Sequence, residues 1–209
     1  MKKLITLSLF LLSFCLFTHA QKLSYGVILG GNAYDIEVKG PLSGGTATSS
    51  LNFGAFAEYQ LSDRFGVKTN FISNTTTERH SYDIRATDGS GTTRIFDEIT
   101  LKTLQVHALL KYDFTNSYKT GMYLAGGLKL NSILDEEAKN DNHLLDGFYN
   151  KTNYVALLGF GINILKHFNV ELLGDYTLSN MLNSDSSKTK NLGLNLNIYI
   201  NIASLINNN

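Results

Sequence analysis

The chain has 209 residues, with 18 basic and 18 acidic side chains, one cysteine and no Trp. The balanced charge and the lone cysteine exclude a strongly basic nucleic-acid binder and a scaffold held by disulfides, so we expect no nucleic acid partner. At 43% apolar residues, the chain is too hydrophobic to be disordered.

The N-terminus has the pattern of a secretory signal peptide. Met1, Lys2 and Lys3 form a positive head, residues 4–17 are almost entirely apolar, and Ala20 is the small residue that a signal peptidase accepts. An uncleaved anchor is the alternative, but no stop-transfer pattern follows. We therefore predict a signal peptide over residues 1–20 and one domain over 21–209. Cleavage after Ala20 would remove Lys2, Lys3 and Cys15. The mature chain would then have 16 basic and 18 acidic residues and no cysteine.

After Gln21 the dominant pattern is an alternation of apolar and polar residues with period two, which is typical of strands. No run of 18 apolar residues occurs there, so no transmembrane helix is predicted. Eight segments carry the alternation, and in chain order they are 23–36, 51–61, 65–71, 104–112, 122–130, 154–164, 168–178 and 192–202. The alternation is clearest in the last segment, where Leu and Ile occupy every second position from Leu192 to Ile202.

The lengths of these segments favour a membrane barrel. Most of the predicted strands have about 9 to 14 residues, whereas strands of ordinary globular proteins have about 5 to 6 and a tilted strand that crosses a bilayer needs about 9 to 11. A break in the alternation near Thr103 predicts either a bulge or a strand that continues above the membrane.

The connections alternate between short and long. Short links are predicted at Ser62-Asp63, around Asn116-Ser117 and at Lys166-His167, and long ones over 38–49, 76–98, 135–152 and 182–189. This is the arrangement of outer-membrane barrels, which have tight periplasmic turns and long outer loops. We therefore predict an all-β fold, an eight-stranded antiparallel up-and-down transmembrane β-barrel in the cell outer membrane.

An unpaired strand edge is not tolerated in hydrocarbon, so the strands must close into a ring. We assign the aliphatic faces of the strands to the lipid outside this ring and the polar faces to its lumen. No Lys or Arg occurs on the eight apolar faces. The interior of an eight-stranded barrel is filled by side chains. The predicted lumen network consists of Glu58, Lys68, His107, Lys111, Asp113, Lys129, Glu171 and Asp175.

The lumen network has three lysines, four carboxylates and His107, which favours a self-neutralising plug. The turn at 62–63 brings Glu58 close to Lys68, so these two are predicted to form a cross-strand ion pair. A proton or ligand relay is the alternative, although nothing in the spacing requires it. Aromatic residues near strand ends predict interfacial girdles, and they are Tyr25, Tyr59, Phe65, Phe114, Tyr154, Phe168 and Tyr176.

No pattern for a metal, a cofactor or catalysis stands out. The histidines that remain after processing, His80, His107, His143 and His167, lack ligand spacing. His80, Ser81 and Asp83 are neighbours in a predicted outer loop, and a solvated loop explains them better than a catalytic triad does. We predict no catalytic residue, no metal and no cofactor.

Three stretches resemble the PorT-like outer-membrane β-barrel family of Bacteroides-type Gram-negative bacteria. They are Ser24 to Asn32, Leu104 to Phe114 and Tyr176 to Met181. His107 stands where that family usually has Pro, and Thr177 stands where it has Gly. Ser204 to Asn209 also extend beyond the last predicted strand without a terminal aromatic residue. The resemblance implies an eight-stranded outer-membrane barrel, and the member that names the family assists protein secretion.

We therefore predict a non-enzymatic outer-membrane protein with a structural or surface-contact role through its long outer loops, and by resemblance an accessory role in secretion. Its expected partners are the lipid bilayer and a protein or surface at those loops. One alternative is a soluble lipocalin-like carrier with the apolar faces inward, although the Gly-x-Trp signature is missing. The other is a lipid-modifying barrel enzyme with His80 and Ser81 as candidates.

Overall fold

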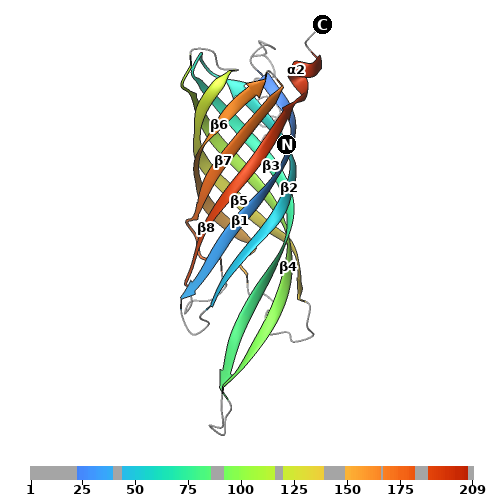
Figure 1. Ribbon diagram of the computed structural model, residues 1–209, viewed down its shortest axis with the longest axis vertical. Coiled ribbons are helices and arrows are strands. Elements are labelled where there is room, and N and C mark those ends of the chain that lie inside the picture. Colours follow the sequence, from blue (N-terminus) through green and yellow to red (C-terminus); the bar gives the residue numbers. More distant parts are fainter. Residues whose placement is uncertain are drawn as a thin grey trace, which may run out of the picture.

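The computed structural model describes residues 23–39, 44–85, 92–115, 120–138, 149–165, 167–181 and 188–206. Eight antiparallel strands close into one barrel, in which each strand pairs with its neighbours in the chain and β8 pairs with β1 (Figure 1). The strands are β1 Leu23–Lys39, β2 Gly44–Gln60, β3 Phe65–Arg85, β4 Thr92–Asp113, β5 Gly121–Ala138, β6 Thr152–Leu165, β7 Phe168–Thr177 and β8 Lys188–Asn201. The predicted fold class is confirmed. The predicted signal peptide, residues 1–20, lies outside the described residues.

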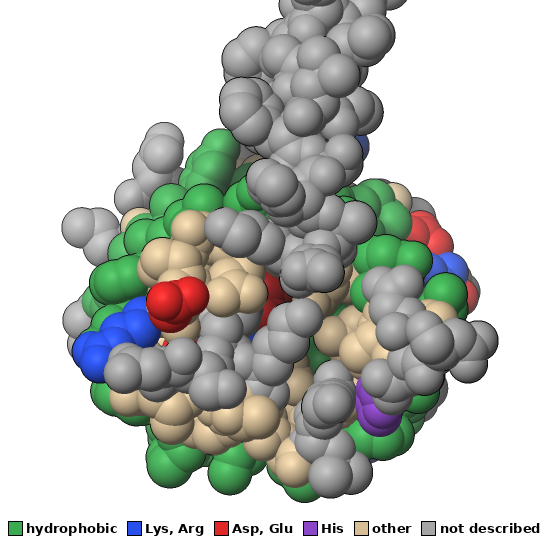
Figure 2. Space-filling view, turned by 90° about the horizontal axis from the view of Figure 1, so that it is seen from above, with side chains coloured by type: hydrophobic (Ala, Val, Ile, Leu, Met, Phe, Trp, Pro, Cys, Tyr) green, Lys and Arg blue, Asp and Glu red, His purple; other side chains and the backbone are tan. Residues whose placement is uncertain are grey.

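The aliphatic faces of the strands form the outside of the barrel. On β8, the side chains of Leu192, Leu194 and Leu196 are 52–70% exposed, while Asn195 and Asn197 are completely buried. Figure 2 shows hydrophobic side chains around the outer wall. The predicted orientation is therefore correct, and the soluble carrier with apolar faces turned inward is wrong.

The strands extend further on one side than the sequence predicts. The segment 76–98, expected to be a loop, is strand up to Arg85 and again from Thr92, and the two strands remain paired from Thr76 with Leu101 to Arg85 with Thr92. The predicted loops 38–49 and 135–152 are likewise partly strand, because β1 and β2 extend to Lys39 and Gly44, and β5 to Ala138. Thr, Ile and Tyr favour strands even where polar residues occur on both faces.

A bulge interrupts the pairing of β4 with β5, as the break near Thr103 predicted. Lys102 pairs with Asp135 and Thr103 with Ile133, so the extra residue is Leu134 of β5. The alternation of β4 itself continues, and it looked broken because the apolar Leu101 faces inward. Lys102 Nζ lies 2.7 Å from Asp135 Oδ2 on the exposed surface. This hydrogen bond, together with the attraction between the two opposite charges, raises the pKa of Lys102 and lowers the pKa of Asp135.

The pairing of β2 with β3 is much shorter than either strand. It runs from Gln60 with Gly66 to Asn52 with Asn74. From there outward, β2 continues only beside β1 and β3 only beside β4 within the described register. The wall of the barrel is therefore split at its outer end, and the β3–β4 hairpin projects away from the rest of the molecule (Figure 1).

The opposite end of the barrel carries the short turns. The backbone of Gly121, with φ of +94°, adopts the left-handed region after the β4–β5 turn. After β8 the chain forms the short helix α2, Ile202–Ile206, whose Ser204 N–H donates to Asn201 Oδ1 at 3.1 Å. Ser204 to Ile206, the described part of the segment expected to extend beyond the last strand, are thus helical. None of the helices in the described ranges has the length and hydropathy needed to cross a bilayer.

The aromatic residues predicted for the girdles all belong to the outer face. Tyr59 is half-buried, and the other six have side chains that are 38–57% exposed. Near the short turns, the ring centroids of Phe65 and Tyr112 are 5.0 Å apart, and those of Tyr112 and Phe114 are 5.6 Å apart. Tyr rings, which carry a polar hydroxyl, are typical of the level where hydrocarbon meets the head groups.

Candidate functional site

The candidate site is the lumen of the barrel. The structure places all eight ionisable residues predicted for the lumen inside the barrel, where none is more than 6% exposed. They come from five strands, and they are Glu58 of β2, Lys68 of β3, His107, Lys111 and Asp113 of β4, Lys129 of β5, and Glu171 and Asp175 of β7.

Each lysine of the lumen forms an ion pair. Lys68 pairs with Glu171, Lys111 Nζ lies 3.0 Å from Glu58 Oε1, and Lys129 Nζ lies 2.6 Å from Asp175 Oδ2. Buried charges are costly unless they are paired in this way. The three pairs connect β3 with β7, β2 with β4, and β5 with β7, so they brace the barrel across its interior.

The predicted ion pair of Glu58 with Lys68 is wrong, although the register behind it is right. The two residues are direct neighbours across β2 and β3. Their charged atoms nevertheless find other partners, because an eight-stranded lumen is narrow enough for a lysine to reach the opposite wall. The Lys68 ammonium group reaches across the lumen and pairs with Glu171 of β7, and the Glu58 carboxylate pairs with Lys111 of β4.

Two buried tyrosines complete this cluster. The Tyr199 hydroxyl donates to Glu171 Oε1 and accepts from Asn70 Nδ2 at 3.0 Å. Lys68 Nζ lies 4.2 Å from the Tyr199 ring centroid, and Lys111 Nζ lies 4.2 Å from that of Tyr123, which are cation–π distances. Neither tyrosine was among the residues predicted for the network. Their parity with the charged residues is the signal that includes them.

Asp113 and His107 have neutral partners. Asp113 Oδ1 accepts the backbone N–H of Thr115 at 2.9 Å and its hydroxyl at 2.6 Å, which fixes the start of the β4–β5 turn. His107 Nε2 lies 3.3 Å from Gln105 Oε1. Among the described residues, no three His, Cys, Asp or Glu side chains gather in a way that holds a metal ion. The side chains of His80, Ser81 and His143 are outside the described part of the chain.

A second buried carboxylate lies nearer the outer mouth. Glu78 of β3 is completely buried and accepts hydrogen bonds from Tyr34 Oη at 2.7 Å and from the Tyr149 hydroxyl. This cluster was not predicted, because Glu78 lies in the segment 76–98, which was expected to be a loop. Glu78 has the same parity along β3 as the inward-facing Asn74 and Thr76, and this shared parity is the sequence signal for the cluster.

Between the ion pairs and Glu78 lies a small polar cavity of about 40 Å³. Asn153, Asp175 and Asn191 line it, and each has a buried side-chain oxygen without a hydrogen-bond partner among the described residues. A volume of this size accommodates about one water molecule. The described interior thus combines paired charges and amides with this small polar space.

The comparisons with known proteins point to one family. Residues 19–183 match the model of a family described as outer membrane protein beta-barrel domain. No curated protein matches the sequence.

Among solved structures, the chain is similar to Ail, the attachment invasion locus protein of Yersinia pestis, with 12% identity over 86% of this chain and 99% of that one and a TM-score of 0.45. It is also similar to OprG of Pseudomonas aeruginosa, with 20% identity over 86% and 94% of the two chains and a TM-score of 0.42. For Neisserial surface protein A, the identity is 12% over 84% and 96%, with a TM-score of 0.33.

Proposed function

The chain belongs to the outer membrane protein beta-barrel domain family, and we propose that it is a non-enzymatic anchor that presents the β3–β4 hairpin at the cell surface to a protein partner. The barrel lies in the outer membrane with the lipid bilayer around its apolar wall. The proposal includes export of the chain with cleavage of residues 1–20.

The projecting hairpin is the observation that carries the proposal. Eleven register pairs, from Thr75 with Lys102 to Arg85 with Thr92, lie beyond the last pair of β2 with β3. At about 3.3 Å per residue they correspond to about 35 Å of strand. Arg79 Nε lies 2.6 Å from Glu98 Oε1 on this hairpin. A paired, extended ribbon supplies a more rigid contact surface than a loop of the same length.

A narrower assignment follows from the resemblance to PorT-like barrels, in which the partner belongs to a secretion apparatus. The two departures from that family's pattern, His107 and Thr177, are both buried in the lumen. They change the interior and leave the outer surface as it is. The secretion role is therefore the second candidate, and the following experiment separates it from the first.

Shortening the hairpin is expected to remove the contact with the partner. We would replace residues 80–97 by Asn-Gly, which favours a two-residue turn between the directly paired Arg79 and Glu98. A photoreactive residue at the exposed Thr77 reports on neighbours in intact cells. We expect the cross-linked adduct of the full-length chain to fall at least about tenfold, which corresponds to about 1.4 kcal/mol of binding.

The matched control shortens the β1–β2 hairpin instead, with Asn-Gly in place of residues 36–46 between the paired Asp35 and Ala47. We expect this variant to keep the adduct. Both variants are compared only where heat-modifiable migration shows a folded barrel. An adduct that persists without residues 80–97 refutes the hairpin contact, and a parallel fall in secreted protein assigns the partner to secretion.

The packed lumen is expected to conduct no ions. Three ion pairs and two tyrosines occupy the central lumen, and interiors of eight-stranded barrels are filled by side chains. In planar bilayers at neutral pH, the purified chain should give no discrete conductance steps, whereas an open porin incorporated in the same way does. Regular, protein-dependent steps would show that the plug is not closed.

A further inference from the structure

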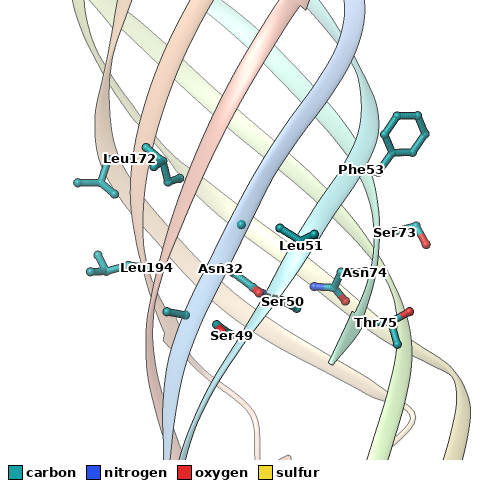
Figure 3. Close-up of a pocket in the computed structure, with 13 residues that line it drawn as sticks. Asn32, Ser49, Ser50, Leu51, Phe53, Ser73, Asn74, Thr75, Leu172 and Leu194 are labelled. Atoms are coloured by element: carbon teal, nitrogen blue, oxygen red, sulfur yellow. Dashed lines mark hydrogen bonds between the residues drawn. The ribbon is translucent and has the colours of Figure 1, made fainter. Parts of the chain in front are cut away.

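The split between β2 and β3 forms a groove in the wall of the barrel. Its inner limit is the pair of Asn52 with Asn74. Further out, Thr48 Oγ1 donates to the carbonyl oxygen of Thr77 at 2.9 Å, which bridges the two strands again. Between these points, residues 49–51 of β2 lie opposite residues 75–76 of β3 without strand pairing in the described register. Figure 3 shows Ser49, Ser50 and Leu51 on one side of this opening, and Ser73, Asn74 and Thr75 on the other.

The groove has a volume of about 920 Å³ and is apolar on its membrane side. Leu51 and Phe53 are 84% and 63% exposed, and Leu194 and Leu196 of β8 line the same groove. The floor between them is low, because β1 has only Gly31 and Ala33 on this face. These side chains belong to the lipid-facing band, so hydrocarbon is the natural occupant of this part.

The outer edge of the same groove is polar. Ser49, Ser73 and Thr75 line it on the surface, and the amides of Asn32 and Asn74 line it from inside the barrel. Asn32 and Asn74 also line the small polar cavity of the lumen, so the groove and that cavity share two residues. Strand edges that face hydrocarbon must find hydrogen-bond partners. An alkyl chain alone does not supply them, whereas a polar head group does.

We propose that this groove binds one lipid of the outer leaflet, with an acyl chain along Leu51, Phe53 and Leu196 and the polar head at the edge formed by Ser49, Ser73 and Thr75. The apolar-to-polar order along the groove matches the order of tail and head in that leaflet. The β3 face changes from Phe71 to Ser73, Thr75 and Thr77 at this height, which marks the end of the hydrocarbon band. The lipid site is independent of the proposed partner of the hairpin.

The experiment maps where a lipid sits on the barrel. The mature full-length chain is folded into phosphatidylcholine vesicles that contain a small fraction of lysophosphatidylcholine with a diazirine in its acyl chain. After photolysis, mass spectrometry locates the labelled residues. We expect groove residues 51–53 and 194–196 to be labelled about fivefold more than residues 128–130, which corresponds to about 1 kcal/mol of preference over the rest of the wall. Leu128 and Leu130 are exposed on the lipid-facing wall and lie outside the groove.

Filling the groove is expected to abolish the preference. Ala33→Leu raises the floor from β1, and Ser73→Leu narrows the groove from β3. Ala108→Leu is the matched control, because Ala108 also faces lipid but does not line the groove. We expect both groove variants to reduce labelling to the level of the wall and the control to leave it unchanged. Even labelling around the wild-type barrel, or full labelling in a folded Ala33→Leu variant, overturns the proposal.

Discussion

Replacement of Lys68 by Ala is expected to lower the free energy of unfolding by about 3–5 kcal/mol, the cost of removing one partner of a buried ion pair. Lys68 is 2% exposed, and its ammonium group pairs with Glu171 and lies over the Tyr199 ring. Without it, the carboxylate of Glu171, which has no exposed surface, loses its cation. Because the chain has no Trp, urea unfolding in lipid vesicles is best followed by heat-modifiable gel migration.

Two variants test whether the unpaired charge causes this loss. Lys68→Met with Glu171→Leu removes both charges, and we expect it to regain most of the stability, since a buried pair replaced by apolar residues is often neutral. Lys102→Ala breaks the exposed pair with Asp135 and should leave the stability almost unchanged, because solvent screens the attraction between exposed charges. If Lys68→Ala is no less stable than Lys102→Ala, the lumen pairs do not hold the barrel together.

Replacement of Leu196 by Arg is expected to cost about 2–4 kcal/mol, because a cation on the lipid face at mid-depth must enter hydrocarbon. Leu196 lies in the middle of the outward series from Leu192 to Ile202 and is 52% exposed. The same change at Leu192, at the outer end of the series, should cost only about 0–1 kcal/mol. Unfolding of both variants in vesicles checks the depth dependence. Equal costs at the two positions would mean that this wall does not face a bilayer.

Parity along the strands accounts for what the sequence predicted well. In a barrel wall each residue faces either lipid or lumen, and the two environments differ so strongly that the alternation is visible without any structure. The inward placement of Lys129 and Asp175 follows from this contrast alone. The β3–β4 hairpin was missed for the same reason. At the outer end of the barrel the outward face of β3 meets water, so the exposed Thr75 and Thr77 are as polar as the inward-facing Thr76 and Glu78, and no contrast in hydropathy reveals the strand.

The partners inside the lumen depend on geometry that no spacing in the sequence contains. Register across a short turn is local, and it correctly placed Glu58 opposite Lys68. The contact of Lys68 with Glu171 joins residues 103 positions apart. It depends on how the barrel closes and on how far its strands are staggered. The position of the extra residue at Leu134 likewise depends on pairing, because the sequence shows a break in pattern but not which strand bulges.

The placement of the ion pairs also orders assembly of the barrel. Lys68 of β3 and Lys129 of β5 both find their carboxylates on β7. A sheet that ends before β7 therefore lacks the carboxylates that pair with these two ammonium groups. Both carboxylates arrive only when the hairpin of β7 and β8 docks. Contacts so distant along the chain form late and make closure slow. We therefore expect neutralisation of the interior and completion of the ring to occur in the same step when this chain inserts into a bilayer.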